Sequence, residues 1–288
     1  MALYAMEHGK HVCIEVPAAI TIEECWQLVE TSERTRKHCR ILENACFRYL
    51  TAINMTRKGY FGRIVHGQGG YVHNLVSHYF FNKNQYWQMW RLRENAARNG
   101  NLYPTHGLGP ICQIMNINRG NKLDYMVSLS SHDFTLRPKA KELAAQDEFF
   151  EPYAYANYRG NMNISLIRTN EGQAITLDHD VSSPNVHDSW QKIVGTKGTS
   201  VNATWAHKLS NGGEKWLTDQ EVAAIESEYA PALLKKIDKM AKEIGGHGGS
   251  DTMQDWFVID NFRNGLPMDQ DVYDAALWSA IAPLSELS

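Results

Sequence analysis

The segment Tyr103-Pro104-Thr105-His106 places a phenol, a rigid turn and an imidazole within four residues. A helix is predicted from His106 to about residue 117, so the imidazole lies at a helix N-terminus. That position disfavours the charged ring and favours neutral imidazole near pH 7, which can accept a proton. Taken alone, such a tetrapeptide is more often structural than catalytic, so its role depends on what surrounds it.

Two short β-type runs end in residues that could meet a ligand. The first ends in Glu15 and Val16, and the second, at residues 40–44, ends in Glu43 and Asn44. Ligands of doubly wound sheets bind at the carboxyl ends of parallel strands, which would bring Glu15 and Asn44 to one site. Glu43 would point elsewhere in a regular strand. On spacing alone, a solvated or helix-capping carboxylate is the commoner role for Glu15.

Two other kinds of site compete with this interpretation. The chain has twelve histidines, but no H-E-x-x-H or paired-cysteine spacing brings ligands together, so no metal is expected. A glycosidase that uses two carboxylates is the second alternative, although no segment singles out such a pair. The five cysteines include no C-x-x-C pair and are expected to be free thiols.

The first sixty residues alternate strand and helix. A capping box of Thr21 and Glu24 opens a helix after the first strand, and residues 47–58 predict another. This order implies parallel strands with right-handed crossovers, as in the last part of a doubly wound, Rossmann-like domain. No G-x-G-x-x-G precedes them, so we expect the first strands to be missing and the chain to begin inside a domain.

The pattern changes from about residue 61. Extended runs with alternating polarity predict a mixed or antiparallel sheet after a strand near residue 63, and they lie at residues 163–168, 173–181 and 192–203. A capping box of Thr218 and Glu221 opens a helix predicted to reach residue 243, before a glycine-rich break and two final helices. The prediction is therefore an α/β chain of two parts: residues 1–60, the C-terminal part of a dinucleotide-binding domain, and residues 61–288, an α+β substrate domain.

Composition and net charge limit the classes of molecule that the chain could bind. Lysine and arginine number 29 against 32 aspartates and glutamates, a net charge of −3 that argues against a nucleic-acid binder. No run approaches the roughly 18 apolar residues of a membrane helix. The first ten residues lack the layout of a signal peptide. A periplasmic or secreted location stays open if a natural N-terminus upstream carries a signal.

Several segments resemble one known family. The strand that ends in Glu15-Val16-Pro17 resembles the Gfo/Idh/MocA oxidoreductases, in which the ending is Glu-Lys-Pro and the lysine is catalytic in sugar dehydrogenases. Val16 stands in place of that lysine and cannot supply a proton. Further blocks resemble glycoside hydrolase family 109, the NAD-dependent α-N-acetylgalactosaminidases, and lie at residues 21–29, 42–44, 101–110 and 245–249.

The resemblance implies a role for individual residues. NAD is expected to contact Glu15, Val16, Asn44 and Tyr103. The sugar, a carbohydrate partner ending in α-N-acetylgalactosamine, is expected to contact seven residues: Tyr71, Arg91, Tyr103, Pro104, Thr105, His106 and His187. The family usually has tyrosine at the position aligned with His187, so substrate preference or activity is expected to differ there. Homo-oligomerisation stays open.

The resemblance also implies a mechanism. NAD⁺ takes hydride from C3 of the sugar, a base removes the acidified C2 proton, the C1 substituent leaves, water adds, and NADH returns the hydride. His106 and Tyr103 are expected to carry the proton transfers, and either could be the C2 base. The alternatives are an NAD-dependent sugar or polyol dehydrogenase, which Val16 disfavours, and an inactive fragment that lacks the pyrophosphate-binding turn.

Overall fold

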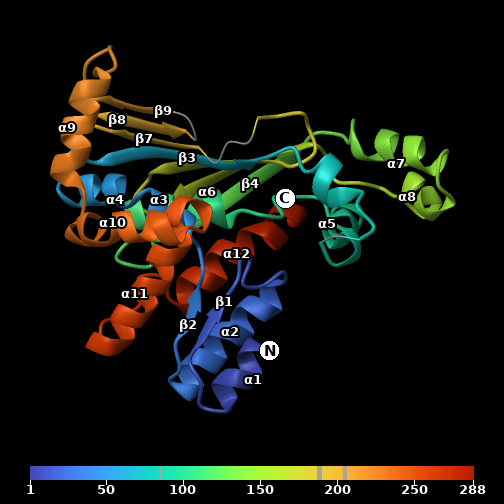
Figure 1. The fold of residues 1–288 in the computed structure, drawn as a ribbon, viewed down its shortest axis with the longest axis horizontal. Helices are drawn as coiled ribbons and strands as arrows, with labels where there is room; N and C mark the ends of the chain where they lie inside the picture. Colours follow the sequence, from blue (N-terminus) through green and yellow to red (C-terminus); the bar gives the residue numbers. More distant parts are fainter. Residues whose placement is uncertain (85, 187–189, 204–205) are drawn as a thin grey trace.

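The structure is a computed structural model that describes residues 1–84, 86–186, 190–203 and 206–288. Figure 1 shows a broad sheet across the molecule, a small strand-and-helix unit at the N-terminus on one side of it, and a helical lobe at one end. Helix α12 (Val272–Leu287) lies between the N-terminal unit and the sheet. The three parts correspond to three buried apolar clusters.

The N-terminal unit has the predicted alternation of strands and helices. Its elements are α1 (Ala2–Glu7), β1 (Val12–Ile14), α2 (Ile22–Thr35) and β2 (Cys39–Ile41). The chain then continues into α3 (Ala45–Arg48) and α4 (Leu50–Arg57), whose buried side chains belong to the apolar cluster of the large sheet. Strands β1 and β2 are parallel, with Val12 opposite Cys39. The predicted capping box is confirmed, because Thr21 Oγ1 accepts from the Glu24 backbone N–H and the Glu24 side chain accepts from the Thr21 backbone N–H. The helix predicted over residues 47–58 is divided in two at Tyr49.

The large sheet is mixed, as the sequence predicts. Among the strands that the structure describes, the order is β4-β5-β6-β3-β7-β8-β9, and β3 and β6 form the one parallel pair. The strands are β3 (Ile64–Val72), β4 (Leu123–Ser130), β5 (Met162–Thr169), β6 (Ala174–Asp180), β7 (Gln191–Gly195), β8 (Thr199–Ala203) and β9 (Ala206–Ser210). Burial alternates residue by residue along β5, because one face of the sheet is covered and the other is open.

Helix α6 (Thr105–Ile114) covers the buried face of this sheet. It lies so close to β3 that backbone meets backbone. A Cβ added at Gly69 would lie 2.5 Å from the Gly107 carbonyl oxygen, and one added at Gly107 would lie 2.8 Å from the Gly70 nitrogen. Only glycine fits both positions, so these residues fix how the start of α6 sits on the sheet.

The remaining helices form the lobe and the C-terminal layer. The lobe contains η1 (Val76–Phe80), α5 (Tyr86–Ala97), α7 (Leu136–Ala144), η2 (Glu148–Phe150) and α8 (Glu151–Ala154). The C-terminal elements are α9 (Asp219–Tyr229), α10 (Ala232–Ile244), η3 (His247–Gly249), α11 (Ser250–Asn264) and α12 (Val272–Leu287). The capping box of Thr218 is confirmed. The single helix predicted to residue 243 is wrong, because the chain breaks before Pro231, which starts α10 as its N-cap.

Helix α12 links the N-terminal unit to the rest. It packs along α2 and contacts β2, α6 and β4. Asp271 caps its N-terminus by accepting from the backbone N–H groups of Tyr273 and Asp274. No helix among the described residues has the length and apolar character needed to cross a membrane.

Candidate functional site

The residues predicted at the strand ends follow β1 and β2 directly. Glu15 is exposed and Val16 is half-buried after β1. Asn44 follows β2 at the N-cap of α3, and its side-chain amide donates to Asp251 Oδ1 at 2.6 Å. The other end of that amide, Asn44 Oδ1, is buried and has no hydrogen-bond partner among the described residues. One acceptor beside the strand end is therefore buried without a partner in the described part of the chain.

His106 lies in the first turn of α6, as the sequence predicts, next to β3. Its ring is 5.4 Å from the ring of Tyr71 and 5.0 Å from that of Tyr103, both in edge-to-face geometry. The rings of Tyr71 and Tyr103 are 4.7 Å apart. Three residues expected to contact the sugar thus form one aromatic cluster, although Tyr71 and His106 are 35 residues apart in the chain.

The Glu43 carboxylate contacts the imidazole of His106 at Nδ1. Its Oε1 atom lies 2.6 Å from His106 Nδ1, and its side chain has no exposed surface. Burial would raise the pKa of this carboxyl, but the charge and hydrogen bond of His106 outweigh burial and the pKa falls below its usual value. Glu43 is the functional candidate that the sequence did not single out. Strand β2 ends at Ile41, so strand alternation does not decide where the Glu43 side chain points.

The helix start and Glu43 act on His106 in opposite senses. The N-terminus of α6 disfavours the charged imidazolium, as the sequence indicated. The Glu43 carboxylate favours it, because an opposite charge at hydrogen-bond distance stabilises the ion.

Arg91 and Tyr103 form a second contact pair. The Arg91 guanidinium carbon is 5.2 Å from the centre of the Tyr103 ring and 4.9 Å from that of Trp90. Arg91 is half-buried, whereas its sequence pattern alone indicates a surface residue. Burial, followed by the charge of Glu43, raises the pKa of Tyr103 well above its usual range. The phenol therefore keeps its proton and can only donate it or share it.

A cavity of about 260 Å³ adjoins this pair. Pro17, Arg91, Tyr103 and His179 are among its lining residues. The His179 ring stacks behind Tyr71 at 6.3 Å. Burial, with the charge of Arg159 nearby, holds the pKa of His179 well below its usual value, so this ring is neutral. The cavity opens between the end of β1 and α5, on the side expected to face the sugar.

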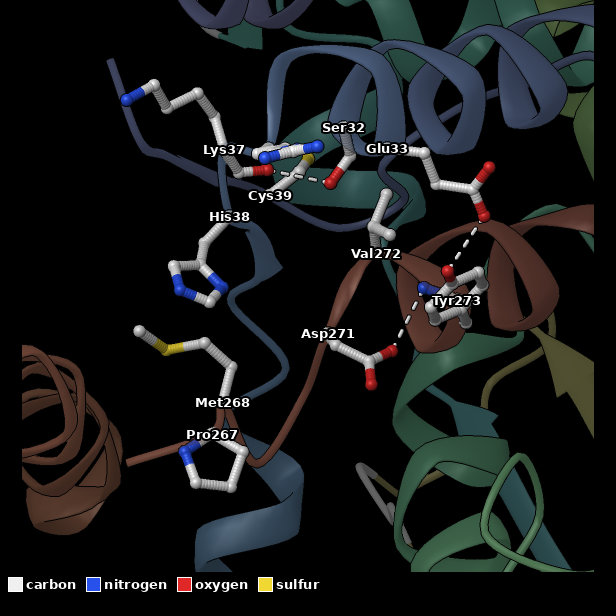
Figure 2. A pocket seen from close by; sticks show the side chains of 11 residues that line it. Ser32, Glu33, Lys37, His38, Cys39, Pro267, Met268, Asp271, Val272 and Tyr273 are labelled. Atoms are coloured by element: carbon white, nitrogen blue, oxygen red, sulfur yellow. Dashed lines mark hydrogen bonds between the residues drawn. The ribbon is translucent and has the colours of Figure 1, made fainter. Parts of the chain in front are cut away.

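A second cavity, of about 360 Å³, lies away from these residues (Figure 2). It is bounded by the end of α2, the start of β2, the segment before α12 and the first turn of α12, where the Tyr273 hydroxyl donates to Glu33. Cys39, which begins β2, lines it. This cavity is therefore at the opposite end of β2 from Asn44, and none of the predicted site residues lines it.

The other predicted contacts divide into two groups. Pro104 and Thr105 are buried under the aromatic cluster, and Thr105 has no exposed surface. His187 lies outside the described residues. No group of three or more histidine, cysteine, aspartate or glutamate side chains that could hold a metal ion occurs in the described ranges.

Solved structures define the class of fold. The chain aligns with an NAD binding oxidoreductase from Klebsiella pneumoniae at a TM-score of 0.72, covering 100% of this chain and 73% of that chain at 12% identity. A levoglucosan dehydrogenase solved with NADH and levoglucosan aligns at a TM-score of 0.70, covering 99% of this chain and 72% of that chain at 16% identity. The fold is that of the Gfo/Idh/MocA oxidoreductases.

The family follows from sequence similarity. The family model described as glycosyl hydrolase 109, C-terminal domain, matches residues 47–288. A glycosyl hydrolase family 109 protein from Solibacter usitatus is 43% identical over 290 residues, covering 100% of this chain and 65% of its own length. The chain therefore belongs to glycosyl hydrolase family 109, a glycosidase family, and it spans just under two thirds of that relative.

Proposed function

We propose that this chain carries the sugar-binding and proton-transfer part of a glycosidase that removes terminal α-N-acetylgalactosamine with the help of NAD. The observation that supports this best is the cluster of Tyr71, Tyr103 and His106, with buried Glu43 behind it, beside the ends of β1 and β2. Family membership supports the glycosidase class, and the longer relatives make the activity a property of the whole protein.

The strand ends fit the nicotinamide part of NAD. Glu15, Val16, Asn44 and Tyr103 would hold it, and the unused acceptor Asn44 Oδ1 suits an amide N–H donor such as a carboxamide group. Val16 adds an apolar contact and no proton. When bound, NAD supplies a hydride acceptor for C3 of the sugar and later returns the hydride.

The residues of this chain then handle protons. Once C3 is a ketone, His106 accepts the C2 proton, and the electron pair of that C–H bond forms a C1–C2 double bond while the C1–O bond breaks. The leaving oxygen keeps its electron pair and takes a proton from Tyr103, whose raised pKa keeps that proton in place until a strongly basic oxygen forms beside it. Water then adds across the double bond, so hydrolysis involves no net oxidation.

The substrate contacts are assigned by position. Arg91 lines the cavity and Tyr71 packs on Tyr103, so both would bind sugar hydroxyls or the acetamido group. Pro104 and Thr105 support the turn that carries Tyr103 and His106. The assignment of His187 to the sugar stays a prediction, as does the boundary between residues 60 and 61.

A sugar dehydrogenase is the second candidate, because the fold is shared with levoglucosan dehydrogenase. A dehydrogenase releases NADH for each sugar oxidised, whereas the proposed cycle regenerates NAD⁺. The two functions therefore differ in net absorbance at 340 nm, and Val16 favours the glycosidase because it cannot act as the lysine of the dehydrogenases does.

The test uses the chain extended at its N-terminus with the preceding segment of the Solibacter usitatus relative. We expect it to retain NAD through purification and to release p-nitrophenol from the α-N-acetylgalactosaminide without net NADH. Removing NAD should abolish release, and adding it back should restore release. Turnover that survives complete removal of NAD would refute the redox route, and steady NADH production from a free sugar would favour the dehydrogenase.

A further inference from the structure

The backbone of Glu43 makes two hydrogen bonds with one buried side chain, that of Gln270. The Glu43 backbone N–H donates to Gln270 Oε1 at 3.0 Å, and the Gln270 amide donates to the Glu43 carbonyl oxygen at 3.1 Å. Gln270 has no exposed surface. The Gln270 amide thus pairs with both the N–H and the carbonyl group of Glu43, as a neighbouring strand would. The segment before α12 therefore fixes the backbone that carries the carboxylate.

The carboxylate itself has little freedom. Its Oε1 atom accepts from the Ala45 backbone N–H at 3.0 Å as well as facing His106. Helix α6 presses on the same side chain, since a Cβ added at Gly109 would lie 3.0 Å from Glu43 Cγ. No water can replace His106 as its partner, because the side chain is fully buried.

This geometry decides which nitrogen of His106 can react. A carboxylate has no proton to donate, so Nδ1 must carry the proton of the 2.6 Å hydrogen bond. In the neutral ring, Nε2 is then the acceptor. We propose that Glu43 is a positioning residue that fixes the tautomer and the orientation of His106, so that Nε2 is the atom that receives the substrate proton.

The role of Glu43 in fixing the His106 tautomer rests on the proposed function in one respect, namely that the proton received by Nε2 is the C2 proton of the sugar. In the step, the C2 proton moves to Nε2, its electron pair stays with the sugar, and the ring becomes an imidazolium beside the Glu43 carboxylate. The carboxylate keeps its charge throughout and stabilises the ion formed. Glu43 therefore acts through His106 and touches no reacting atom.

The first test reads the tautomer directly and needs no catalysis. Histidine side-chain nitrogens are labelled with ¹⁵N in the chain, His106 is assigned by its loss in His106→Gln, and spectra are taken at mildly alkaline pH. We expect His106 to carry its proton on Nδ1 and to lose this preference in Glu43→Gln, which keeps the shape and removes the charge. A proton on Nε2 in the unmutated chain, or an unchanged spectrum in Glu43→Gln, would overturn the proposal.

Glu226→Gln is the matched control. Glu226 makes the same kind of contact, 2.5 Å from His207 Nδ1, but in another part of the molecule and with 43% of its side chain exposed. The His106 signals should be unchanged in this variant. If both variants alter His106 alike, the effect is a general loss of structure and Glu43 has no special role.

The second test measures turnover in the N-terminally extended protein. Glu43→Gln should lower kcat at least about tenfold while changing KM and NAD retention little, because orientation of a general base is lost and binding is not. Glu43→Asp keeps the negative charge on a side chain that is shorter by one methylene group, and it should recover part of the rate. This variant also controls for the possibility that Glu43→Gln loses activity because it misfolds. An equal loss in both variants would contradict positioning by charge. If the unmutated protein has no glycosidase activity, the proposed function fails, and the tautomer spectra still decide the role of Glu43.

Discussion

Two histidine–glutamate pairs in this chain have almost the same contact distance but different surroundings. His106 Nδ1 lies 2.6 Å from Glu43, and His207 Nδ1 lies 2.5 Å from Glu226. The Glu43 side chain has no exposed surface, whereas 43% of the Glu226 side chain is exposed. Water can replace the partner of Glu226, so that pair is worth at most about 1 kcal/mol. The comparison shows that burial, rather than distance, makes such a pair a fixed geometric element.

Removing the two imidazoles should give the largest contrast. His106→Ala is expected to lower turnover of the extended protein about 10²-fold or more, the usual size of a general acid–base contribution, while NAD stays bound. His207→Ala should leave turnover within about twofold, since the second pair joins β9 to α9 far from the cluster. The measurement is kcat for p-nitrophenol release. Near-normal turnover in His106→Ala would show that the buried pair is structural only.

A smaller contrast comes from the helix that carries His106. Gly107→Ala places a Cβ 2.8 Å from the Gly70 nitrogen, where only backbone could yield, and should cost about 1–3 kcal/mol of stability. It should also displace His106 and lower kcat. The control is Gly213→Ala, where an added Cβ meets nothing within 4 Å. Thermal melting compares the two, and equal melting temperatures would mean that α6 can move off β3 at no cost.

The smallest expected effect is a dependence on pH. The pKa of Glu43 in the folded chain lies below its ordinary value of 4.5, despite the burial that opposes this. Such a carboxyl contributes stability that is fully present above the unfolded pKa and is lost as pH falls through the folded pKa. The stability advantage over Glu43→Gln should therefore be constant above pH 4.5 and narrow below it. Melting curves over this range measure the gap, and a gap that widens on acidification would contradict the assignment.

Local features of the fold were predictable from the sequence, because their interactions span few residues. Both capping boxes, at Thr21 and Thr218, join residues three apart and are confirmed. The sequence predicts no strand at β4, where the relation of polarity to burial is reversed, with Val127 and Leu129 exposed and Ser128 and Ser130 partly buried. The run at residues 192–203 reads as one extended segment, and the hairpin between β7 and β8 breaks it at Gly198.

The sequence pointed to candidate site residues only through the family resemblance and through the residues that follow predicted strands. The sequence brought Tyr103 and His106 together because they are neighbours in the chain. It did not connect His106 to Glu43, since 63 residues separate them and the contact depends on how α6 packs on the end of β2. Gln270 is 227 residues from Glu43 and carries no motif, so nothing local marks it.

The contact between Gln270 and Glu43 has a consequence for biosynthesis. The ribosome makes Glu43 first and must add 227 residues before Gln270 exists. At the usual rates of translation this delay is roughly 10 to 45 s. Throughout that interval the backbone of Glu43 lacks its two hydrogen bonds to Gln270. Glu43 therefore acquires its full set of backbone contacts long after His106 has been synthesised.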